Sequence, residues 1–301
     1  MRPYRGEQDL ARVLELLLAC LPAGQVDMEI RSIELRTLLA DPDFDAERWT
    51  LLRGAPGGEL RSFALLWGGH VLGMLARPEA RGGEEEALLD WAASRVAAER
   101  LIVLCRDDDA ALMARLQRRG FVVGQEELRL ERDLASAIDE PRLPAGFRIR
   151  PLDVPGELAE WEDLYRASIG PRERAIRKWR AYRSDPDYLP ELDLVAVDGH
   201  GRIAAACTCT VASLELGRST IKEGRTEPIM VGADYRRLGL GRAIVLTGLL
   251  LLAARGLDVA RLTMEPGNHP ACRLYTSLGY RPIYQALWYR QPRSVPPAQI
   301  R

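Results

Sequence analysis

A single stretch, from Glu227 to Tyr280, limits the possible folds more than any other part of the chain. A short segment with β-branched residues leads into Gly239 and Gly241, and a largely apolar run follows over residues 243–254. After one more glycine comes a second apolar segment, 257–264. Apolar runs of these lengths, separated by glycine turns, predict strand, turn, helix, strand and helix in succession.

The glycine turn has the residue types that an anion site needs. Gly239 and Gly241 have no Cβ atoms, so backbone N–H groups there can approach a ligand closely. The helix that follows adds unpaired N–H groups and the positive end of its dipole, which favour a phosphate. Arg236, Arg237 and Arg242 add positive charge around the turn. An ordinary strand-to-helix connection has the same pattern, so the turn alone does not define a function.

The end of the stretch carries a second pattern, Asn268-x-x-Ala271-x-x-Leu274-Tyr275-x-x-x-Gly279-Tyr280. In this order and spacing the two patterns resemble the GNAT superfamily of acetyl-CoA-dependent N-acetyltransferases. Arg236-x-x-Gly239-x-Gly241 corresponds to the pyrophosphate loop of that family. The second pattern corresponds to its other cofactor motif, with Tyr280 where phenylalanine is usual. The resemblance covers residues 147–290 by motif and residues 1–134 by topology only.

The resemblance implies that acetyl-CoA binds as the cosubstrate and that no metal takes part. The diphosphate would be held at the glycine turn. The amide-rich pantetheine arm would lie between two strands that splay apart, against the backbone from Val231 to Ala233. Ala233 stands where many family members have proline. The implied cofactor-binding residues are Val231, Ala233, Arg236, Arg237, Leu238, Gly239, Leu240, Gly241, Arg242, Asn268 and Ala271.

Tyr275 is the candidate general acid. Acetyl transfer to an amine requires that the amine lose a proton and that the leaving thiolate be protonated or stabilised. By resemblance, Tyr275 occupies the position whose hydroxyl lies close to the sulfur and can protonate it. The alternative role for Tyr275 is that of a buried residue that anchors the last helix.

Glu227 is the candidate general base. It shares strand parity with Ile229 and Val231, which places all three side chains on one face. Many family members have a glutamate on this strand that deprotonates the amine directly or through water. A surface glutamate at a strand end is the alternative. His269 is a second candidate base, although its place before Pro270 at a helix start favours contact with cofactor or solvent.

The composition is that of a soluble globular protein, with 47% apolar and 28% charged residues. The net charge of −1 gives no drive towards nucleic acid or anionic membranes. The apolar run 243–254 is shorter than the roughly 20 residues that span a bilayer. Five cysteines without a CxxC pair or metal-ligand spacing favour free thiols in a reducing cytoplasm. We therefore expect a cytoplasmic protein with a small-molecule amine acceptor, no nucleic-acid or membrane partner, and compatibility with a homodimer.

The two halves of the 301-residue chain repeat one order of predicted elements. In the first half these include strands at 2–5 and 48–52, helices at 7–20 and 28–39, and a glycine-rich turn at 54–58. The sequence therefore predicts an α/β fold with mixed sheets, built as two tandem GNAT-like acyl-CoA N-acyltransferase domains. This arrangement resembles tandem GNAT proteins of the mycothiol synthase type. The predicted ranges are a domain at 1–134, a linker at 135–146, a catalytic domain at 147–290 and a loose tail at 291–301.

The first copy lacks the glycine loop. When the halves are aligned on Gly120 and Gly279, three consecutive carboxylates, Glu84–Glu86, fall where the loop should be. They would repel a diphosphate, and we interpret them as the solvated first turn of a helix. The same alignment sets Asp109 opposite Asn268. We therefore expect a degenerate first copy and a catalytic second copy.

The predicted function is that of an acyl-CoA-dependent N-acyltransferase, with acetyl as the default acyl group. The acyl group would pass to a primary amine of a small molecule by direct attack in a ternary complex. The alternative is a catalytically inactive GNAT-fold module that binds or regulates. An acidic segment at 185–193 would either attract a cationic amine or form a solvated loop.

Overall fold

The computed structural model describes residues 1–21, 27, 29–54, 58–96 and 100–291. Parts of three predicted features lie outside these residues: the start of the helix at 28, the turn at 55–57 and the tail at 292–301. Among the described residues, no helix is both long enough and apolar enough to cross a membrane.

The chain forms two compact units, each a mixed sheet with helices. Unit 1 combines Met1–Glu127 with the segment that begins at Tyr284, and unit 2 is Leu128–Ile283. The division differs from the predicted ranges 1–134 and 147–290 because two strands are exchanged. Residues 128–133 pair with a strand of unit 2, and residues 286–290 pair with a strand of unit 1.

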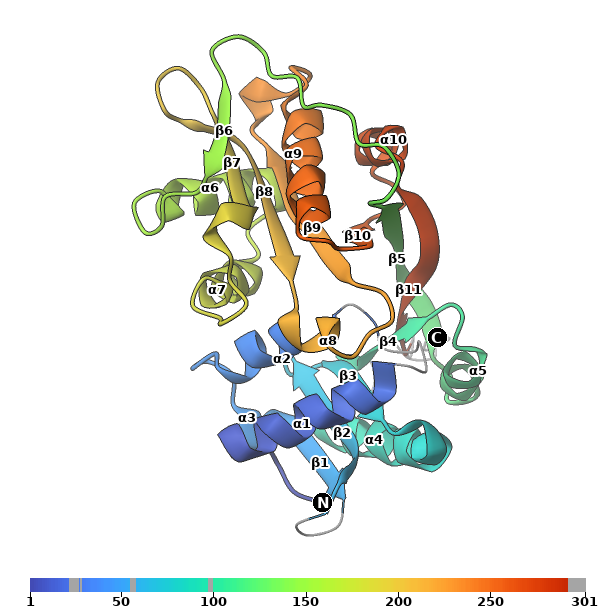
Figure 1. The fold of residues 1–301 in the computed structure, drawn as a ribbon. Helices are drawn as coiled ribbons and strands as arrows, with labels where there is room; N and C mark the ends of the chain where they lie inside the picture. Colours follow the sequence, from blue (N-terminus) through green and yellow to red (C-terminus); the bar gives the residue numbers. More distant parts are fainter. Residues whose placement is uncertain (22–26, 28, 55–57, 97–99, 292–301) are drawn as a thin grey trace, which may run out of the picture. The chain divides into compact units, whose positions relative to one another are not determined.

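Unit 1 has the strand order β1-β2-β3-β4-β11 (Figure 1). Two predictions near the start of unit 1 are wrong. The predicted strand at 2–5 is only an isolated bridge between Arg2 and Leu52. The predicted strand at 48–52 begins only at Thr50, because a turn of helix precedes it, capped by the Asp45 side chain, which accepts a hydrogen bond from Arg48 N–H. The elements are α1 (Glu7–Cys20), α2 (Ser32–Leu39), α3 (Ala46–Trp49), β1 (Thr50–Gly54), β2 (Leu60–Trp67), β3 (Val71–Ala76), α4 (Arg81–Arg95), β4 (Ile102–Arg106), α5 (Ala110–Arg118) and, shared with unit 2, β5 (Val122–Asp133) and β11 (Arg281–Arg290).

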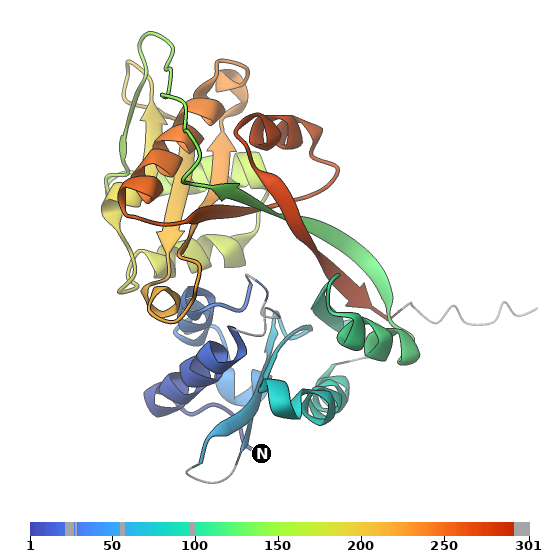
Figure 2. The same ribbon diagram turned by 45° about the vertical axis from the view of Figure 1, so that its right-hand side comes forward.

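Unit 2 has the strand order β5-β10-β9-β8-β7-β6, with α9 against one face of the sheet and α6 against the other (Figures 1 and 2). Its other elements are β6 (Arg148–Pro151), α6 (Leu158–Ile169), α7 (Glu173–Tyr182), β7 (Asp193–Val197), β8 (Ile203–Val211), α8 (Ser213–Leu216), β9 (Glu223–Val231), α9 (Leu240–Ala254), β10 (Val259–Met264) and α10 (His269–Ser277).

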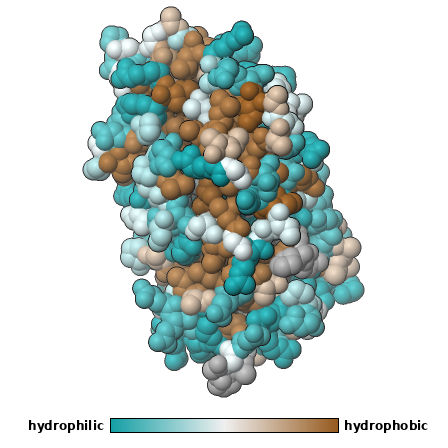
Figure 3. All heavy atoms as spheres, viewed as in Figure 1, coloured by the Kyte–Doolittle hydropathy of each residue, from teal (hydrophilic) through white to brown (hydrophobic). Residues whose placement is uncertain are grey.

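The central strands of unit 2 are buried on both faces. Alternate residues of β7 and β8 pack into two different cores, one beneath α9 and one around Trp161 of α6. This double burial explains why β7 reads as a continuous apolar run rather than an alternating one. Hydrophobic residues also reach the surface over the region of α9, bordered by hydrophilic ones (Figure 3).

The segment 135–146 has no helix or strand, yet it is held against unit 2. Ile138 and Leu143 pack on the core beneath α9. The Arg132 side chain donates to the carbonyl oxygen of Ala137 over 2.7 Å. This segment therefore packs against unit 2 and is not a free spacer.

Asp193 forms a buried polar centre in unit 2. Its carboxylate is fully buried and accepts hydrogen bonds from Arg183 Nε at 2.8 Å and from Thr208 Oγ1 at 2.8 Å. The Arg183 guanidinium also lies over the Trp161 ring, 4.2 Å from its centre. Asp187 is buried too and bonds to Ser213. The acidic segment 185–193 is thus neither a solvated loop nor an amine site at these two residues, since both carboxylates are buried and hydrogen-bonded to internal partners.

Candidate active site

The glycine turn leads into α9 with an uncapped helix N-terminus. Gly239 is the N-cap residue, has φ = 87°, and contributes no side-chain hydrogen bond. The N–H groups of Leu240, Gly241 and Arg242 therefore have no partner within the helix. An exposed Leu238, with 46% of its surface accessible, precedes them. The turn has the backbone geometry that an anionic group requires.

Gly241 has a role that the sequence pattern did not indicate. A Cβ atom at this position would lie 3.3 Å from Val231 Cγ2 and 3.5 Å from Leu274 Cδ2. A side chain there would push α9 away from β9 and α10. The second glycine of the loop therefore allows close packing of the cofactor elements, whereas the first allows the left-handed backbone.

The three arginines of the loop differ in what they contact. Arg236 and Arg237 are exposed, and within the described part of the chain neither has an ion-pair partner. Arg242 Nη2 is 2.6 Å from Asp139 Oδ2, and its Nη1 is 3.1 Å from Ser277 Oγ. Arg236 and Arg237 are thus available for a phosphate, while Arg242 connects α9 to α10 and to the segment 135–146.

β9 and β10 diverge beside this turn. They pair in parallel only from Glu223–Arg225 with Val259–Arg261. Beyond that point β9 follows β8, where Val231 pairs with Ala205, and β10 follows β5 as far as Met264. The sheet therefore opens at the place where the pantetheine arm was predicted to lie, and Ala233 begins the exposed turn that follows β9.

A bulge lies where the two strands diverge. Glu227 and Pro228 together occupy the place opposite Thr208, because the register of β8 and β9 shifts there. An extra residue interrupts side-chain alternation. Strand alternation from Ile229 therefore does not establish the direction of the Glu227 side chain.

The Glu227 side chain reaches across the opening between the strands. Its Oε2 accepts a hydrogen bond from Thr263 N–H of β10 over 2.8 Å. Thr263 lies just past the last parallel pair, so this N–H is one that β9 no longer satisfies. Glu227 is half-buried, which is not the exposed strand-end position that was the alternative.

Tyr275 is buried in α10 close to this carboxylate. Burial raises the pKa of Tyr275 far above its usual range, and electrostatic interaction with the Glu227 carboxylate raises it further. The phenol therefore remains protonated at neutral pH. Its ring packs edge-on against Tyr280, with ring centres 5.9 Å apart, and Tyr280 in turn shares a 2.5 Å hydrogen bond with Thr226 of β9. The Tyr275 phenol therefore lies within electrostatic reach of the Glu227 carboxylate.

The remaining residues of the second motif build α10 itself. Asn268 is the N-cap, and its side-chain oxygen accepts from Ala271 N–H over 3.2 Å. His269 is exposed at the first position of the helix. At the other end Gly279 has φ = 84°, and a Cβ atom there would lie 2.8 Å from Arg132 Nε, which donates to the carbonyl of Leu278. Helix capping therefore explains Asn268 at the start of α10, and the positive φ with the close approach of Arg132 explains Gly279 after its end.

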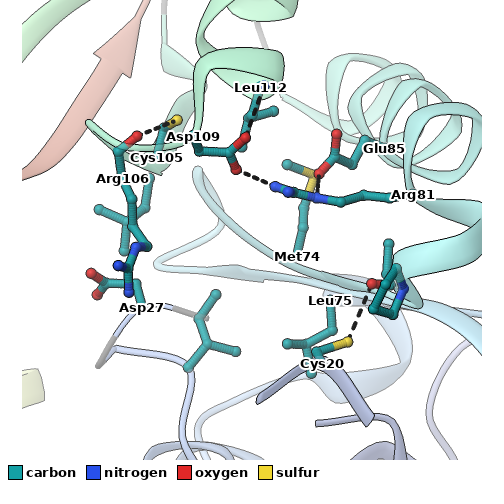
Figure 4. Close-up of a pocket in the computed structure, with 14 residues that line it drawn as sticks. Cys20, Asp27, Met74, Leu75, Arg81, Glu85, Cys105, Arg106, Asp109 and Leu112 are labelled. Carbon is teal, nitrogen blue, oxygen red and sulfur yellow. Dashed lines mark hydrogen bonds and ion pairs between the residues drawn. The ribbon is translucent and has the colours of Figure 1, made fainter. Parts of the chain in front are cut away.

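Unit 1 has a corresponding opening that its own side chains fill (Figure 4). β3 and β4 pair in parallel at two positions and then separate around a cavity of about 50 Å³. Arg81 lies in it, bonded to Glu85 at 2.5 Å and to Asp109. Glu84 and Glu85 are both buried and ion-paired, so the prediction of a solvated first turn is wrong. Asp109 caps α5 just as Asn268 caps α10.

Comparison with known proteins is consistent with this geometry. The profile of the acetyltransferase (GNAT) family matches residues 157–280. This part of the chain is a GNAT acetyltransferase domain. It contains β9, the glycine turn, α9, β10 and α10, and therefore every residue of the opening described above except those of β5.

Relatives extend the likeness beyond the GNAT domain to nearly the whole chain. The mycothiol acetyltransferase of Geodermatophilus obscurus is 28% identical over 294 residues, which cover 93% of this chain and 94% of that protein. That of Clavibacter michiganensis subsp. michiganensis is 29% identical over 220 residues, 70% of this chain and 68% of that protein. Together with the GNAT acetyltransferase domain at residues 157–280, these relatives support the assignment of the protein as an N-acetyltransferase.

A solved structure shows the same fold over both units. A tandem GNAT protein from the clavulanic acid biosynthesis pathway superposes with a TM-score of 0.68 at 15% identity, covering 96% of each chain. The prediction of two tandem GNAT-like domains is thereby confirmed. Within the described residues no group of three or more histidine, cysteine, aspartate or glutamate side chains is placed to hold a metal ion.

Proposed function

We propose that the protein transfers an acetyl group from acetyl-CoA to the primary amine of a small molecule, by direct attack in a ternary complex. The observation that carries this proposal is a half-buried carboxylate, Glu227, at the divergence of β9 and β10, within electrostatic reach of a buried protonated phenol, Tyr275. One group can accept a proton and the other can donate one, as acyl transfer between a thioester and an amine requires.

The cofactor would lie along the elements that open at this point. Backbone N–H groups of Leu240 to Arg242, with the exposed Arg236 and Arg237, suit the diphosphate. The backbone from Val231 to Ala233 borders the opening where the pantetheine arm would extend. Asn268 and Ala271 contribute by holding the first turn of α10 in place.

The reaction follows from the positions of the two side chains. Glu227 takes a proton from the acceptor amine, whose nitrogen then forms a bond to the thioester carbonyl carbon. The C–S bond breaks as the tetrahedral intermediate collapses, and the Tyr275 hydroxyl gives its proton to the departing sulfur. Burial raises the pKa of Tyr275, so the phenol carries its proton before transfer, as a proton donor must.

The acceptor is proposed to be a small amine of the kind that the relatives modify. Both relatives described above are mycothiol acetyltransferases, and one matches nearly the full chain. The test is a thiol-release assay with acetyl-CoA and a panel that contains the unacetylated precursor of mycothiol, aminoglycosides and simple primary amines, with Tyr275→Phe as the control enzyme. Amine-dependent thiol release that falls in the control supports the proposal. Acetyl-CoA binding without release by any amine would instead favour an inactive binding module.

A further inference from the structure

A chain of hydrogen bonds reaches Glu227 from the exchanged strand β5. Arg129 Nη1 donates to Thr263 Oγ1 over 2.9 Å, and Thr263 N–H donates to Glu227 Oε2 over 2.8 Å. Arg129 stands directly opposite Thr263 in the antiparallel pair of β5 and β10. Directly opposite residues have side chains on the same face and within contact distance. Strand register, rather than a loop, therefore sets this arrangement.

The side chains of Arg129 and Thr263 lie on the face of the sheet opposite α9. The neighbours of Thr263 along β10, Leu262 and Met264, belong to the core beneath α9, and side chains alternate along a strand. Tyr275 belongs to that same core. Glu227, at the strand divergence, is thus bonded through Thr263 and also lies within electrostatic reach of Tyr275.

Arg129 brings a buried cation to this site. Its side chain is fully buried, where charges interact through a lower effective dielectric than in water. Cys207 on β8 and Tyr275 on α10 interact electrostatically with Glu227. A hydrogen bond to Cys209 and burial raise the pKa of Cys207, and burial raises that of Tyr275. Both are therefore neutral at neutral pH, whereas Arg129 is charged.

We propose that Arg129 is a positioning residue for the catalytic base, acting through Thr263 to orient the Glu227 carboxylate at the strand divergence. The inference rests on the proposed function, which assigns the base to Glu227. It implies that the first half of the sequence supplies a residue to the active site of the second copy, by way of the exchanged strand. The cation also favours the charged form of the carboxylate, and this gives a measurement that does not depend on the acceptor.

The first test measures the ionisation of Glu227 in the full-length protein labelled with carboxyl-¹³C glutamate. The resonance of Glu227 is the one that Glu227→Gln lacks. Removal of the cation in Arg129→Met should raise the pKa of Glu227 by about one unit, whereas Arg129→Lys, which keeps the charge, should leave it within about 0.3 units. An unchanged pKa in folded Arg129→Met would overturn the proposal.

The second test uses thiol release from acetyl-CoA with the unacetylated mycothiol precursor as the probe amine. Thr263→Val removes Oγ1 and keeps the backbone N–H, and Thr263→Ser is the matched control. Thr263→Val should lower kcat about tenfold, with the KM for acetyl-CoA within about twofold, and Thr263→Ser should retain the wild-type rate.

The same substitution in a Glu227→Gln background separates positioning from general damage. If Thr263 acts through Glu227, Thr263→Val should cause no further loss there. An equal loss in both backgrounds would show that Thr263 is merely structural and would overturn the inference. A wild-type rate in Glu227→Gln alone would instead refute the assignment of the base in the proposed function.

Discussion

Gly279 is the residue of the second motif whose replacement the structure allows us to predict most sharply. It has φ = 84°, a conformation that strains any other residue. In addition, a Cβ atom would lie 2.8 Å from Nε of Arg132, the atom that donates to the Leu278 carbonyl over 2.8 Å. Gly279→Ala should therefore strain the backbone and also displace a charged hydrogen bond.

The two contributions can be separated with a control in the same unit. Gly256, with φ = 73°, ends the turn after α9, and a Cβ atom there would meet nothing within 4 Å. Gly256→Ala should therefore cost only the strain, about 1–2 kcal/mol. Gly279→Ala should cost that plus the displaced bond, which is worth about 1.5–3 kcal/mol because the donor is charged. The expected sum is about 2.5–5 kcal/mol.

Guanidinium chloride unfolding, followed by circular dichroism, measures the difference in the free energy of unfolding between each variant and the wild type. In an Arg132→Met background the extra cost of Gly279→Ala should disappear, leaving a cost similar to that of Gly256→Ala. A Gly279→Ala variant whose free energy of unfolding falls no more than that of Gly256→Ala, both in the wild-type background, would contradict this prediction. That result would show that the contact between the added Cβ atom and Arg132 does not lower the stability of the protein.

Three further predictions concern the site. Tyr275→Phe should lower kcat by about 10²–10⁴-fold in the thiol-release assay with little change in acetyl-CoA affinity; an unchanged kcat where chemistry limits turnover would make Tyr275 structural. Glu227→Gln should remove the acid limb of the pH–rate profile, since protonation inactivates the wild-type carboxylate as the pH falls, whereas His269→Ala should retain the limb. The opposite pattern would move the base to His269. Calorimetry should find one acetyl-CoA per chain, and Gly239→Trp should abolish binding because tryptophan is strained at φ = 87°; two sites per chain would contradict the asymmetry of the copies.

Apolar periodicity and motif spacing in the sequence were enough to predict the internal repeat, the order of most elements and the family of the second copy. The bounds of α1, Glu7–Cys20, follow directly from apolar periodicity. The spacing of Gly239, Gly241, Asn268 and Tyr275 predicted the GNAT domain, because turns and helix caps are local and depend on residues that are close in sequence.

Strand pairs and ion pairs between residues far apart in sequence are visible only in the folded structure. Strand exchange, which gives β5 to one unit and β11 to the other, depends on pairing between segments more than a hundred residues apart, and no local pattern encodes that pairing. The bulge at Glu227 interrupts the alternation from which its direction was inferred. Likewise Glu84 and Glu85 read as a polar helix turn, yet they are buried, since arginines distant in sequence neutralise them. A charge can be buried only with a partner, and the partner is chosen by the fold.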